Sequence, residues 1–277
     1  MLALATRSAK EAAAISLASF GDAPATRKAD TTVVTETDHA IQARILAAIA
    51  EAYPEHAVLA EERVPYPQAH AAIAKARYCW VVDPLDGTRN YAAGFPVFST
   101  SIAVLNRGRP VVAVVYEHQL DCLYTALAGE GATLNDQPIH VRETYADLDM
   151  LVAIPTSKDP LAVAVACNWA ATPGLVCRNV GSTALHLAMV ASGALSAVFS
   201  KRSKIWDVAA GALLVIEAGG RITDHLGGER LPFDLTARPD ADLPFLAAAP
   251  YAHERLLGPI RKAAEALVQR ERVKDEG

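Results

Sequence analysis

The chain has 277 residues, of which 52% are hydrophobic and 21% are charged, and its formal net charge is −5. This composition excludes a disordered chain, and the length is sufficient for one large domain or two compact lobes with a substantial core. A net negative charge argues against a protein that wraps the backbone of a nucleic-acid polymer, because that function requires a basic surface.

The first twenty residues predict an amphipathic helix rather than a signal peptide, because Arg7, Lys10 and Glu11 interrupt the apolar stretch. No run of eighteen apolar residues occurs without a charge, so no membrane partner is expected. The four cysteines form no CxxC pair, and we expect them to be buried, reduced small apolar residues. These features predict a cytoplasmic protein.

The first half of the chain, residues 1–145, predicts an α+β lobe. Helical spacing of apolar residues and alternating segments with Gly-, Asn- and Pro-containing turns indicate its elements. We expect a helix that opens at Asp38 and is ended by Pro54. In chain order the expected elements are a helix at 9–20, an extended piece or hairpin at 27–38, a helix at 38–53, a strand at 57–62, a loop with some helix at 63–77, a strand at 78–83 and antiparallel strands within 100–141.

The second half, residues 146–277, alternates strands and helices and predicts an α/β lobe. One helix is expected to begin at a cap formed by Ser182 or Thr183, and another is expected to begin at a cap formed by Asp207. The expected elements are a strand at 148–156, helices at 160–172 and 182–193, a strand at 194–200, a helix at 207–220, strands within 221–227 and 244–250, and a final helix at 253–273.

The motif WVVDPLDGTRNY, residues 80–91, places two acids directly after a buried strand. Pro84 fixes φ and Gly87 permits a tight turn, so we expect the chain to fold back there. Asp83 and Asp86 would then face one space, where two carboxylates suit Mg²⁺ with a phosphate ester as a further partner. The competing interpretation is structural, with Asp86 as a helix cap and Asp83 as a turn former.

Further acids stand at the ends of other predicted elements. Glu61 and Glu62 close an earlier strand, and Asp207 lies more than a hundred residues further along the chain. Like charges brought together raise each other's pKa, so a shared cluster is tolerable mainly when cations occupy it. Backbone N–H groups at Gly87 and Thr88 can hold a phosphate oxygen beside it. The pattern therefore favours a magnesium and phosphate site.

These residues resemble the inositol monophosphatase family of Mg²⁺-dependent, lithium-sensitive phosphatases. The resemblance runs over residues 9–250 and is carried by Glu61 and Glu62, by the motif at 80–91 and by WDVAAGALLVIEAGG at 206–220. It implies an α+β fold with alternating αβαβα layers, a sugar-phosphatase-like two-lobed arrangement with the site between the lobes. It also implies two or three Mg²⁺ ions as cofactors and a homodimer.

Carried over residue by residue, the resemblance implies a set of metal ligands. These are Glu61, Asp83, the backbone carbonyl of Leu85, Asp86 and Asp207. Thr88, with Glu61, would orient and activate the attacking water, and Asp86 belongs to the same catalytic group. The resemblance also implies that Asp38 and Glu62 support the metal site from further out.

The same resemblance implies how the substrate is held. The Gly87 and Thr88 amides would bind the phosphate, and Gly181, Ser182 and Thr183 would contact the leaving group. A helix N-cap is the alternative role of the loop at 181–183, and the two roles are compatible.

The sequence departs from the family at Ser200, where inositol-cleaving members typically carry a Glu that holds the inositol hydroxyls. A basic loop, KRSK at 201–204, follows, and Lys201 and Arg202 are candidates for contacting a second anionic group. That interpretation suits a bisphosphate, such as a 3′-phosphoadenosine 5′-phosphate-like nucleotide or fructose 1,6-bisphosphate, or a substrate with a carboxylate. The alternative is a solvated basic loop.

The leading hypothesis is a Mg²⁺-dependent phosphomonoesterase that hydrolyses a small phosphorylated metabolite through metal-activated water. Inositol 1-phosphate is the first candidate substrate, followed by histidinol phosphate and the bisphosphates. Two metal ions can hold the attacking and leaving oxygens, so this mechanism needs no histidine as a nucleophile. The eight histidines, His186 included, are therefore expected at the surface or in packing contacts. The competing class is a non-catalytic metal-binding scaffold, and a nucleic-acid polymer is not expected as a partner.

Overall fold

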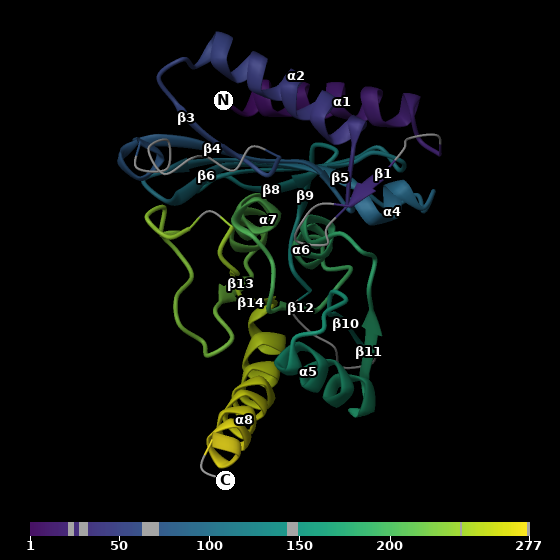
Figure 1. Cartoon of the computed structure of the whole chain (residues 1–277), viewed down its shortest axis with the longest axis vertical. Helices are drawn as coiled ribbons and strands as arrows, with labels where there is room; N and C mark the ends of the chain where they lie inside the picture. Colours follow the sequence, from purple (N-terminus) through teal and green to yellow (C-terminus); the bar gives the residue numbers. More distant parts are fainter. Residues whose placement is uncertain (22–24, 28–32, 63–71, 143–148, 239, 276–277) are drawn as a thin grey trace.

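The computed structural model describes residues 1–21, 25–27, 33–62, 72–142, 149–238 and 240–275. Helices and sheets alternate in five layers, as predicted (Figure 1). The three helical layers are α1 (Leu2–Ala18) with α2 (Glu36–Ala52), α6 (Thr183–Ala191) with α7 (Ile205–Glu217), and α5 (Pro160–Ala171) with α8 (Pro250–Asp275). A seven-stranded sheet lies between the first two layers, and a five-stranded sheet lies between the last two.

The seven-stranded sheet confirms the antiparallel strands predicted within 100–141. Its order is β3-β4-β5-β6-β7-β8-β9, and only the first pair is parallel. Helices cover both faces, so seven of the eight residues of β5 are buried. The strands are β3 (Ala57–Ala60), β4 (Tyr78–Asp86), β5 (Ser99–Asn106), β6 (Arg109–Glu117), β7 (Cys122–Leu127), β8 (Gly131–Leu134) and β9 (Gln137–Ile139).

A hairpin leads into α2. β1 (Ala25–Arg27) pairs antiparallel with β2 (Val33–Thr35), so the hairpin is the alternative that forms, although it begins before the predicted range. Residues 28–32 lie outside the described residues. Of the predicted loop with some helix at 63–77, residues 63–71 also lie outside them, and residues 72–75 are helical. The prediction that Asp38 opens the helix is wrong, because Asp38 is its third residue. Its carboxylate reaches back and accepts the N–H of Thr35 at 2.8 Å, which satisfies a donor that no helical carbonyl can reach.

The five-stranded sheet contains one strand that the sequence does not predict. That strand, β11, is a short, partly exposed edge strand that pairs in parallel with β10. The predicted lobe boundary at residue 145 falls within 143–148, outside the described residues. In spatial order the strands are β11 (Leu175–Arg178), β10 (Met150–Ala153), β12 (Ala197–Ser200), β14 (Phe245–Ala248) and β13 (Arg221–Thr223).

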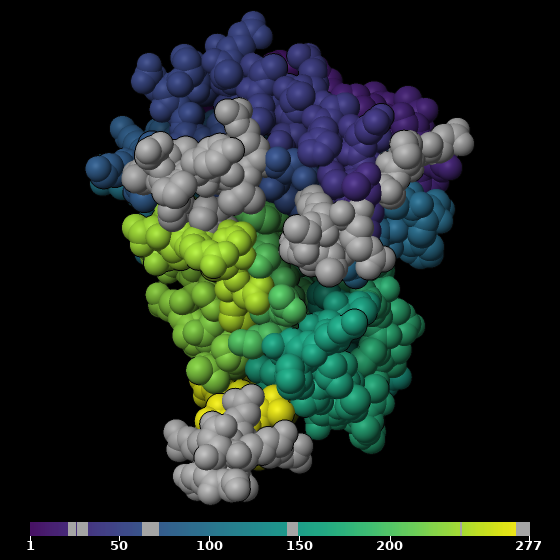
Figure 2. Space-filling view, in the orientation of Figure 1, coloured from purple at the N-terminus to yellow at the C-terminus, as the bar shows by residue number. Residues whose placement is uncertain are grey.

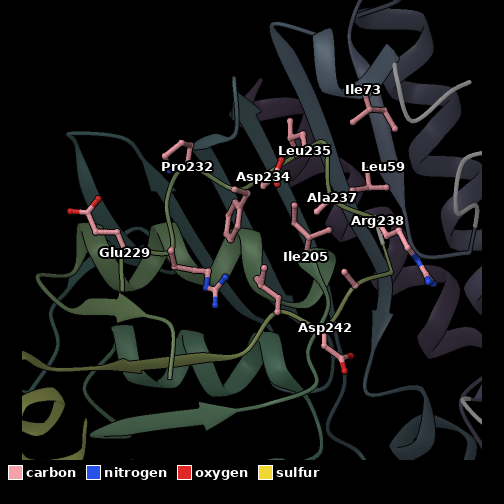
Figure 3. Close-up of a pocket in the computed structure, with 14 residues that line it drawn as sticks. Leu59, Ile73, Ile205, Glu229, Pro232, Asp234, Leu235, Ala237, Arg238 and Asp242 are labelled. Carbon is pink, nitrogen blue, oxygen red and sulfur yellow. The ribbon is translucent and has the colours of Figure 1, made fainter. Parts of the chain in front are cut away.

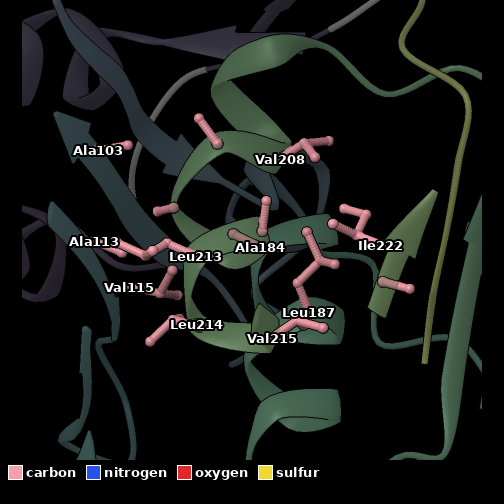
Figure 4. Packing of buried hydrophobic residues seen from close by; sticks show 14 of the residues in the cluster. Ala103, Ala113, Val115, Ala184, Leu187, Val208, Leu213, Leu214, Val215 and Ile222 are labelled. Atoms are coloured by element: carbon pink, nitrogen blue, oxygen red, sulfur yellow. The ribbon is translucent and has the colours of Figure 1, made fainter. Parts of the chain in front are cut away.

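The central helices form the main hydrophobic core together with the first sheet (Figure 4). Leu213 and Leu214 of α7 lie beside Ala113 and Val115 of β6, and all four are almost fully buried. Burying one leucine side chain contributes roughly 1.5–3 kcal/mol. This packing fixes α7 against the sheet and so determines where its first turn lies.

No helix in the described part of the chain is long and apolar enough to cross a membrane. All four cysteines are free thiols, but only Cys79 is buried, and Cys167 and Cys177 are exposed, contrary to expectation. His186, like His118 and His253, is buried, and burial lowers the pKa of its imidazole to about 4. These histidines are packing residues, as expected.

Candidate metal and phosphate site

Asp83 and Asp86 lie on β4 itself rather than on a turn after it, which corrects the sequence-based expectation. In a regular strand, residues three apart point to opposite faces. A bulge adds one residue to β4 here, because Asp83 pairs with Ser101 whereas Asp86 pairs with Ser99. Ser99 and Ser101 share one face of β5, so both carboxylates lie on that face.

Glu61 reaches the same place because β3 runs parallel to β4. Its N–H continues the pairing of the two strands by donating to the carbonyl of Val82 at 3.2 Å. Glu61 therefore lies beside Asp83 where both strands approach the central helices. The next residue, Glu62, is tied to α2 because its N–H donates to Oε1 of Gln42 at 3.0 Å.

The first turn of α7 brings Asp207 to this cluster from the other side. The hydroxyl of Ser101 donates to the carbonyl of Trp206 at 3.2 Å, so the residue before Asp207 contacts the strand that pairs with Asp83. Asp207 is the third residue of the helix rather than its cap, which corrects the prediction. Its Oδ2 accepts the N–H of Lys204 at 2.7 Å.

The four acids lie close enough to repel one another. Burial raises the pKa of Asp83 well above its usual value, and the charges of Glu61, Asp86 and Asp207 raise it further. Burial likewise raises the pKa of Asp207, and the charges of Asp86 and Glu61 add to that rise. The structure thus brings together carboxylates that come from three separate parts of the sequence.

Asp86 also connects the cluster to α6. Its Oδ2 accepts hydrogen bonds from Ser182 Oγ at 2.7 Å and from the N–H of Ala184 at 2.6 Å. Burial raises the pKa of Asp86 to about 6, although these hydrogen bonds oppose the rise. Ser182 is at the same time the N-cap of α6, because its Oγ accepts the N–H of Leu185. The structural role predicted for Ser182 is therefore confirmed, and Ser182 lies at the cluster as well.

A sharp turn and a short helix follow β4. Gly87 has φ of +93°, and a Cβ there would lie 3.1 Å from the carbonyl oxygen of Val97, so the turn requires glycine. Thr88 begins the short helix α4 (Thr88–Ala92). Its Oγ1 lies 3.1 Å from Oδ1 of Asp38 and 2.9 Å from the carbonyl oxygen of Leu85. The predicted phosphate turn and the supporting acid are thus in direct contact.

A buried chain of polar groups, not predicted from the sequence, supports the bulge. Thr100 Oγ1 donates to the carbonyl of Pro84 at 2.8 Å and lies 3.0 Å from Nε2 of His118. Nδ1 of His118 lies 2.7 Å from Oγ of Ser16 in α1. The polar run at 99–101, in a strand that is otherwise apolar, was the available signal.

Two side chains hold the peptide groups of Val180, directly before the predicted substrate loop. Asn90 Nδ2 donates to the carbonyl of Val180 at 2.7 Å, and the N–H of Val180 donates to Nε2 of His186 at 3.0 Å. Gly181 packs against this contact, because a Cβ there would lie 2.7 Å from the Asn90 amide. Asn90 is part of the quoted motif, but sequence alone assigns it no partner.

The basic loop after β12 is partly neutralised. Arg202 Nε lies 3.4 Å from Asp242 Oδ2, and Lys204 Nζ lies 2.7 Å from Oδ1 of the same residue. Ser200 is buried, and its Oγ lies 2.6 Å from Oγ of Ser203. Substrate contacts by Lys201 and Arg202 remain a prediction.

The donor set of the cluster fits Mg²⁺. Carboxylate and carbonyl oxygens are the ligands that this ion prefers, and a cation relieves the repulsion between neighbouring acids. Within the described ranges, no three Asp, Glu, His or Cys side chains already stand at metal-ligating separation. Which of the predicted ligands bind, and how many ions they hold, therefore stay predictions.

Comparison with known proteins shows which family the chain belongs to. The sequence model of the inositol monophosphatase family matches residues 1–265. The chain belongs to the inositol monophosphatase family. Among its relatives, "Nus factor SuhB" of Pasteurella multocida is 35% identical over 82% of this chain and 86% of the relative. "Inositol monophosphatase 2" of Solanum lycopersicum is 38% identical over 74% of this chain and 78% of the relative.

Solved structures confirm the fold. The Thermotoga maritima IMPase superposes with a TM-score of 0.83 at 26% identity and covers 96% of this chain and 98% of its own. Membership of the inositol monophosphatase family supports a metal-dependent phosphatase that acts on a phosphorylated small molecule. The names of the relatives differ, so they do not define one substrate for this member.

Proposed function

We propose that the protein is a Mg²⁺-dependent phosphomonoesterase that hydrolyses a small phosphorylated metabolite, with inositol 1-phosphate as the first candidate. One observation carries the proposal: Glu61, Asp83, Asp86 and Asp207 repel one another in a cluster in which Asp83 is buried and the other three acids are partly buried. Such an arrangement is unfavourable unless a divalent cation balances the charge. When bound, Mg²⁺ supplies Lewis-acid activation of water and neutralises charge on the phosphate.

The hydroxyl of Thr88 orients the attacking water in this proposal. It lies 3.1 Å from Oδ1 of Asp38, so it can donate its proton to that carboxylate. Its oxygen lone pairs then accept a hydrogen bond from water, which fixes the direction of attack. The N–H groups of Gly87 and Thr88 would hold a phosphate oxygen.

The pairing of the basic loop favours a monophosphate over a bisphosphate. Asp242 offsets the charge of Arg202 and Lys204, so less positive charge remains for a second phosphate group. Ser200 offers only a hydroxyl, which already lies 2.6 Å from Ser203 Oγ. Inositol 1-phosphate and histidinol phosphate are therefore stronger candidate substrates than fructose 1,6-bisphosphate and the 3′,5′-bisphosphate nucleotide.

Release of inorganic phosphate from these four substrates tests the proposal. We expect the protein to release phosphate from a monophosphate. This release should require Mg²⁺, stop with excess EDTA and return when Mg²⁺ is restored. Release that continues unchanged in EDTA would contradict the metal-dependent mechanism. Absence of release from all four, with Mg²⁺ binding intact, would favour the non-catalytic metal-binding scaffold. Cytoplasmic location, a homodimer and the lack of a nucleic-acid partner remain predictions.

A further inference from the structure

A line of hydrogen bonds crosses the first sheet and ends on the Asp83 carboxylate. Thr100 stands between Ser99 and Ser101 on β5, so its side chain lies on the opposite face of the sheet from the acid cluster. That face is covered by α1 and α2, the purple and blue layer at the top of Figure 2. The polar groups on this face are therefore enclosed between the sheet and the N-terminal helices.

The outer part of this line joins Ser16 of α1 to Thr100 through His118. Nδ1 of His118 lies 2.7 Å from Ser16 Oγ, and Nε2 lies 3.0 Å from Thr100 Oγ1. The ring of Phe98 packs edge-to-face with the imidazole at a centroid distance of 5.4 Å, and all four residues are buried. Both ring nitrogens have partners, and the orientation of the ring is fixed.

The inner part of the line passes through one peptide group of the bulge. Thr100 Oγ1 donates to the carbonyl of Pro84 at 2.8 Å. The N–H of the same peptide group, which belongs to Leu85, donates to Oδ1 of Asp83 at 3.0 Å. A peptide group is planar and rigid, so a bond that holds its carbonyl also sets the direction of its N–H. Thr100 therefore determines where the donor for Asp83 points.

Among the described residues, this N–H is the only hydrogen-bond donor that the structure gives to the Asp83 carboxylate. The nearby cavity of about 390 Å³ has Leu59 and Ile205 in its wall, and Figure 3 shows both in the middle of the view. They stand two residues before Glu61 and two residues before Asp207, respectively. Aliphatic side chains donate no hydrogen bonds, so at these positions the cavity offers no substitute for the peptide N–H.

The hydrogen positions along the line follow from the number of donors. Burial lowers the pKa of His118 to about 3, so the imidazole is neutral and has one N–H. Ser16 Oγ also lies 3.0 Å from the carbonyl of Ala13, but that carbonyl is inside α1, where the helix already provides a donor. The carbonyl of Pro84 is in the bulge, where the ladder of hydrogen bonds is interrupted. The single proton of Thr100 therefore goes to Pro84. Nε2–H of His118 then donates to Thr100, and Ser16 donates to Nδ1.

We propose that Thr100 and His118 are positioning residues for the metal site, a role that rests on the proposed function. The Nε2–H of His118 commits the Thr100 proton to the Pro84 carbonyl. The peptide group that begins at this carbonyl then holds its N–H against Asp83. Asp83 is thereby oriented before Mg²⁺ binds, which lowers the cost of assembling the ligands. Without the Thr100 hydroxyl the carboxylate is less constrained, and Mg²⁺ binds more weakly.

Mg²⁺ binding without substrate tests this role. The full chain, freed of metal, is titrated with Mg²⁺ while its amide signals are followed by NMR, which also measures weak binding. Thr100→Val keeps the shape of the side chain and removes the hydroxyl, and it should weaken binding about 10-fold. Thr100→Ser keeps the hydroxyl and should stay within about 2-fold of the wild type. Wild-type affinity in Thr100→Val overturns the proposal.

The second sheet contains a matched control. Thr223 of β13 is buried, and its Oγ1 lies 2.8 Å from Nε2 of His253 and donates to the carbonyl of Asp224 at 2.9 Å. It has the same kinds of partner as Thr100, and neither partner belongs to the acid cluster. Thr223→Val should lower the melting temperature, as Thr100→Val does, and leave Mg²⁺ binding within about 2-fold of the wild type. Equal weakening of Mg²⁺ binding in both valine variants would trace it to general destabilisation and overturn the proposal.

The tautomer of His118 gives a second test, which uses the wild type alone. ¹⁵N NMR at neutral pH distinguishes a protonated from an unprotonated ring nitrogen, and contacts with the Phe98 ring assign the signals. We expect a proton on Nε2 and none on Nδ1. A proton on Nδ1 alone would draw the Thr100 proton to Nε2 and away from Pro84, which overturns the proposal.

The positioning role and the proposed function fail in different ways. A wild type that binds Mg²⁺ but releases no phosphate from any substrate overturns the proposed function, and the binding measurements still decide the role of Thr100. A wild type that releases phosphate, with equal Mg²⁺ affinity in Thr100→Val, overturns the positioning role alone. A wild type that binds no Mg²⁺ overturns both.

Discussion

The hydroxyl of Ser182 lies 2.7 Å from Oδ2 of Asp86, although the two residues are 96 positions apart in the chain. Ser182 caps α6 in the central layer, and Asp86 ends β4 of the first sheet. One hydrogen bond therefore joins the predicted substrate loop to a predicted metal ligand. A change in the loop is transmitted directly to the orientation of that carboxylate.

Asp86→Asn should reduce turnover by a factor on the order of 10³ while the fold is kept, because a neutral amide is a weaker ligand for Mg²⁺. In the metal-free protein the same change removes one of the mutually repelling charges, so its melting temperature should rise or stay unchanged. Steady-state phosphate release and calorimetry with EDTA measure the two effects. Wild-type turnover by this variant at limiting Mg²⁺ would falsify the assignment.

Ser182→Ala should lower kcat/KM by roughly 10–100-fold, because Asp86 loses the donor that orients it. Ser192→Ala is the matched control, since Ser192 Oγ bonds the carbonyl of Met189 at the other end of α6. The control should retain activity within about 2-fold. Equal losses in both variants would indicate general destabilisation of α6 rather than an effect on Asp86.

Thr88→Val should lower kcat by about 100-fold or more with a smaller effect on KM, because the variant cannot donate to Asp38 or accept from water. Thr88→Ser keeps the hydroxyl and should retain most of the activity. Full activity of Thr88→Val would show that another group orients the water.

Mg²⁺ binding should weaken as the pH falls through about 6. Burial raises the pKa of Asp86 to about 6 in the metal-free protein, so protons compete with the ion below that pH. Titration calorimetry at pH 5 and pH 7.5 measures the difference, and Mg²⁺ should raise the melting temperature more at the higher pH. Affinity that is equal at both values would contradict a carboxylate site of this kind.

Protonation of the buried His118 predicts a stability change with pH. Burial lowers the pKa of His118 from 6.5 to about 3, so the unfolded chain binds more protons than the folded chain between these values. This residue therefore makes the unfolding free energy fall by up to about 1.4 kcal/mol per pH unit as the pH drops from 6.5 toward 3. Denaturant unfolding at pH 7 and pH 5 should show a smaller pH effect in His118→Gln than in the wild type. An identical pH effect in both proteins would exclude His118 as its source.

Several parts of the site could be predicted from sequence because they are local. The spacing of Asp83, Asp86 and Gly87 indicates two acids beside a turn, and a Ser or Thr before an apolar helical run indicates a cap such as Ser182. Local sequence patterns did not predict the correct first residue of a helix where an acidic side chain accepts a hydrogen bond from the backbone N–H three residues earlier. For that reason Asp38 and Asp207 were expected at the start of their helices and are the third residues instead.

The sequence by itself determined the order of most helices and strands and the acid-rich motif, because these depend on hydrophobic periodicity and on residues near one another in the chain. It also indicated the family, through the resemblance of the motifs at 80–91 and 206–220. Only the tertiary structure decided that a bulge turns Asp83 and Asp86 to one face, that Ser182 holds Asp86, and that Asp242 partly neutralises the basic loop. Each of these depends on strand register or on contacts between residues far apart in the chain. Such contacts form only when the sheets and central helices pack together, so no local sequence pattern predicts them.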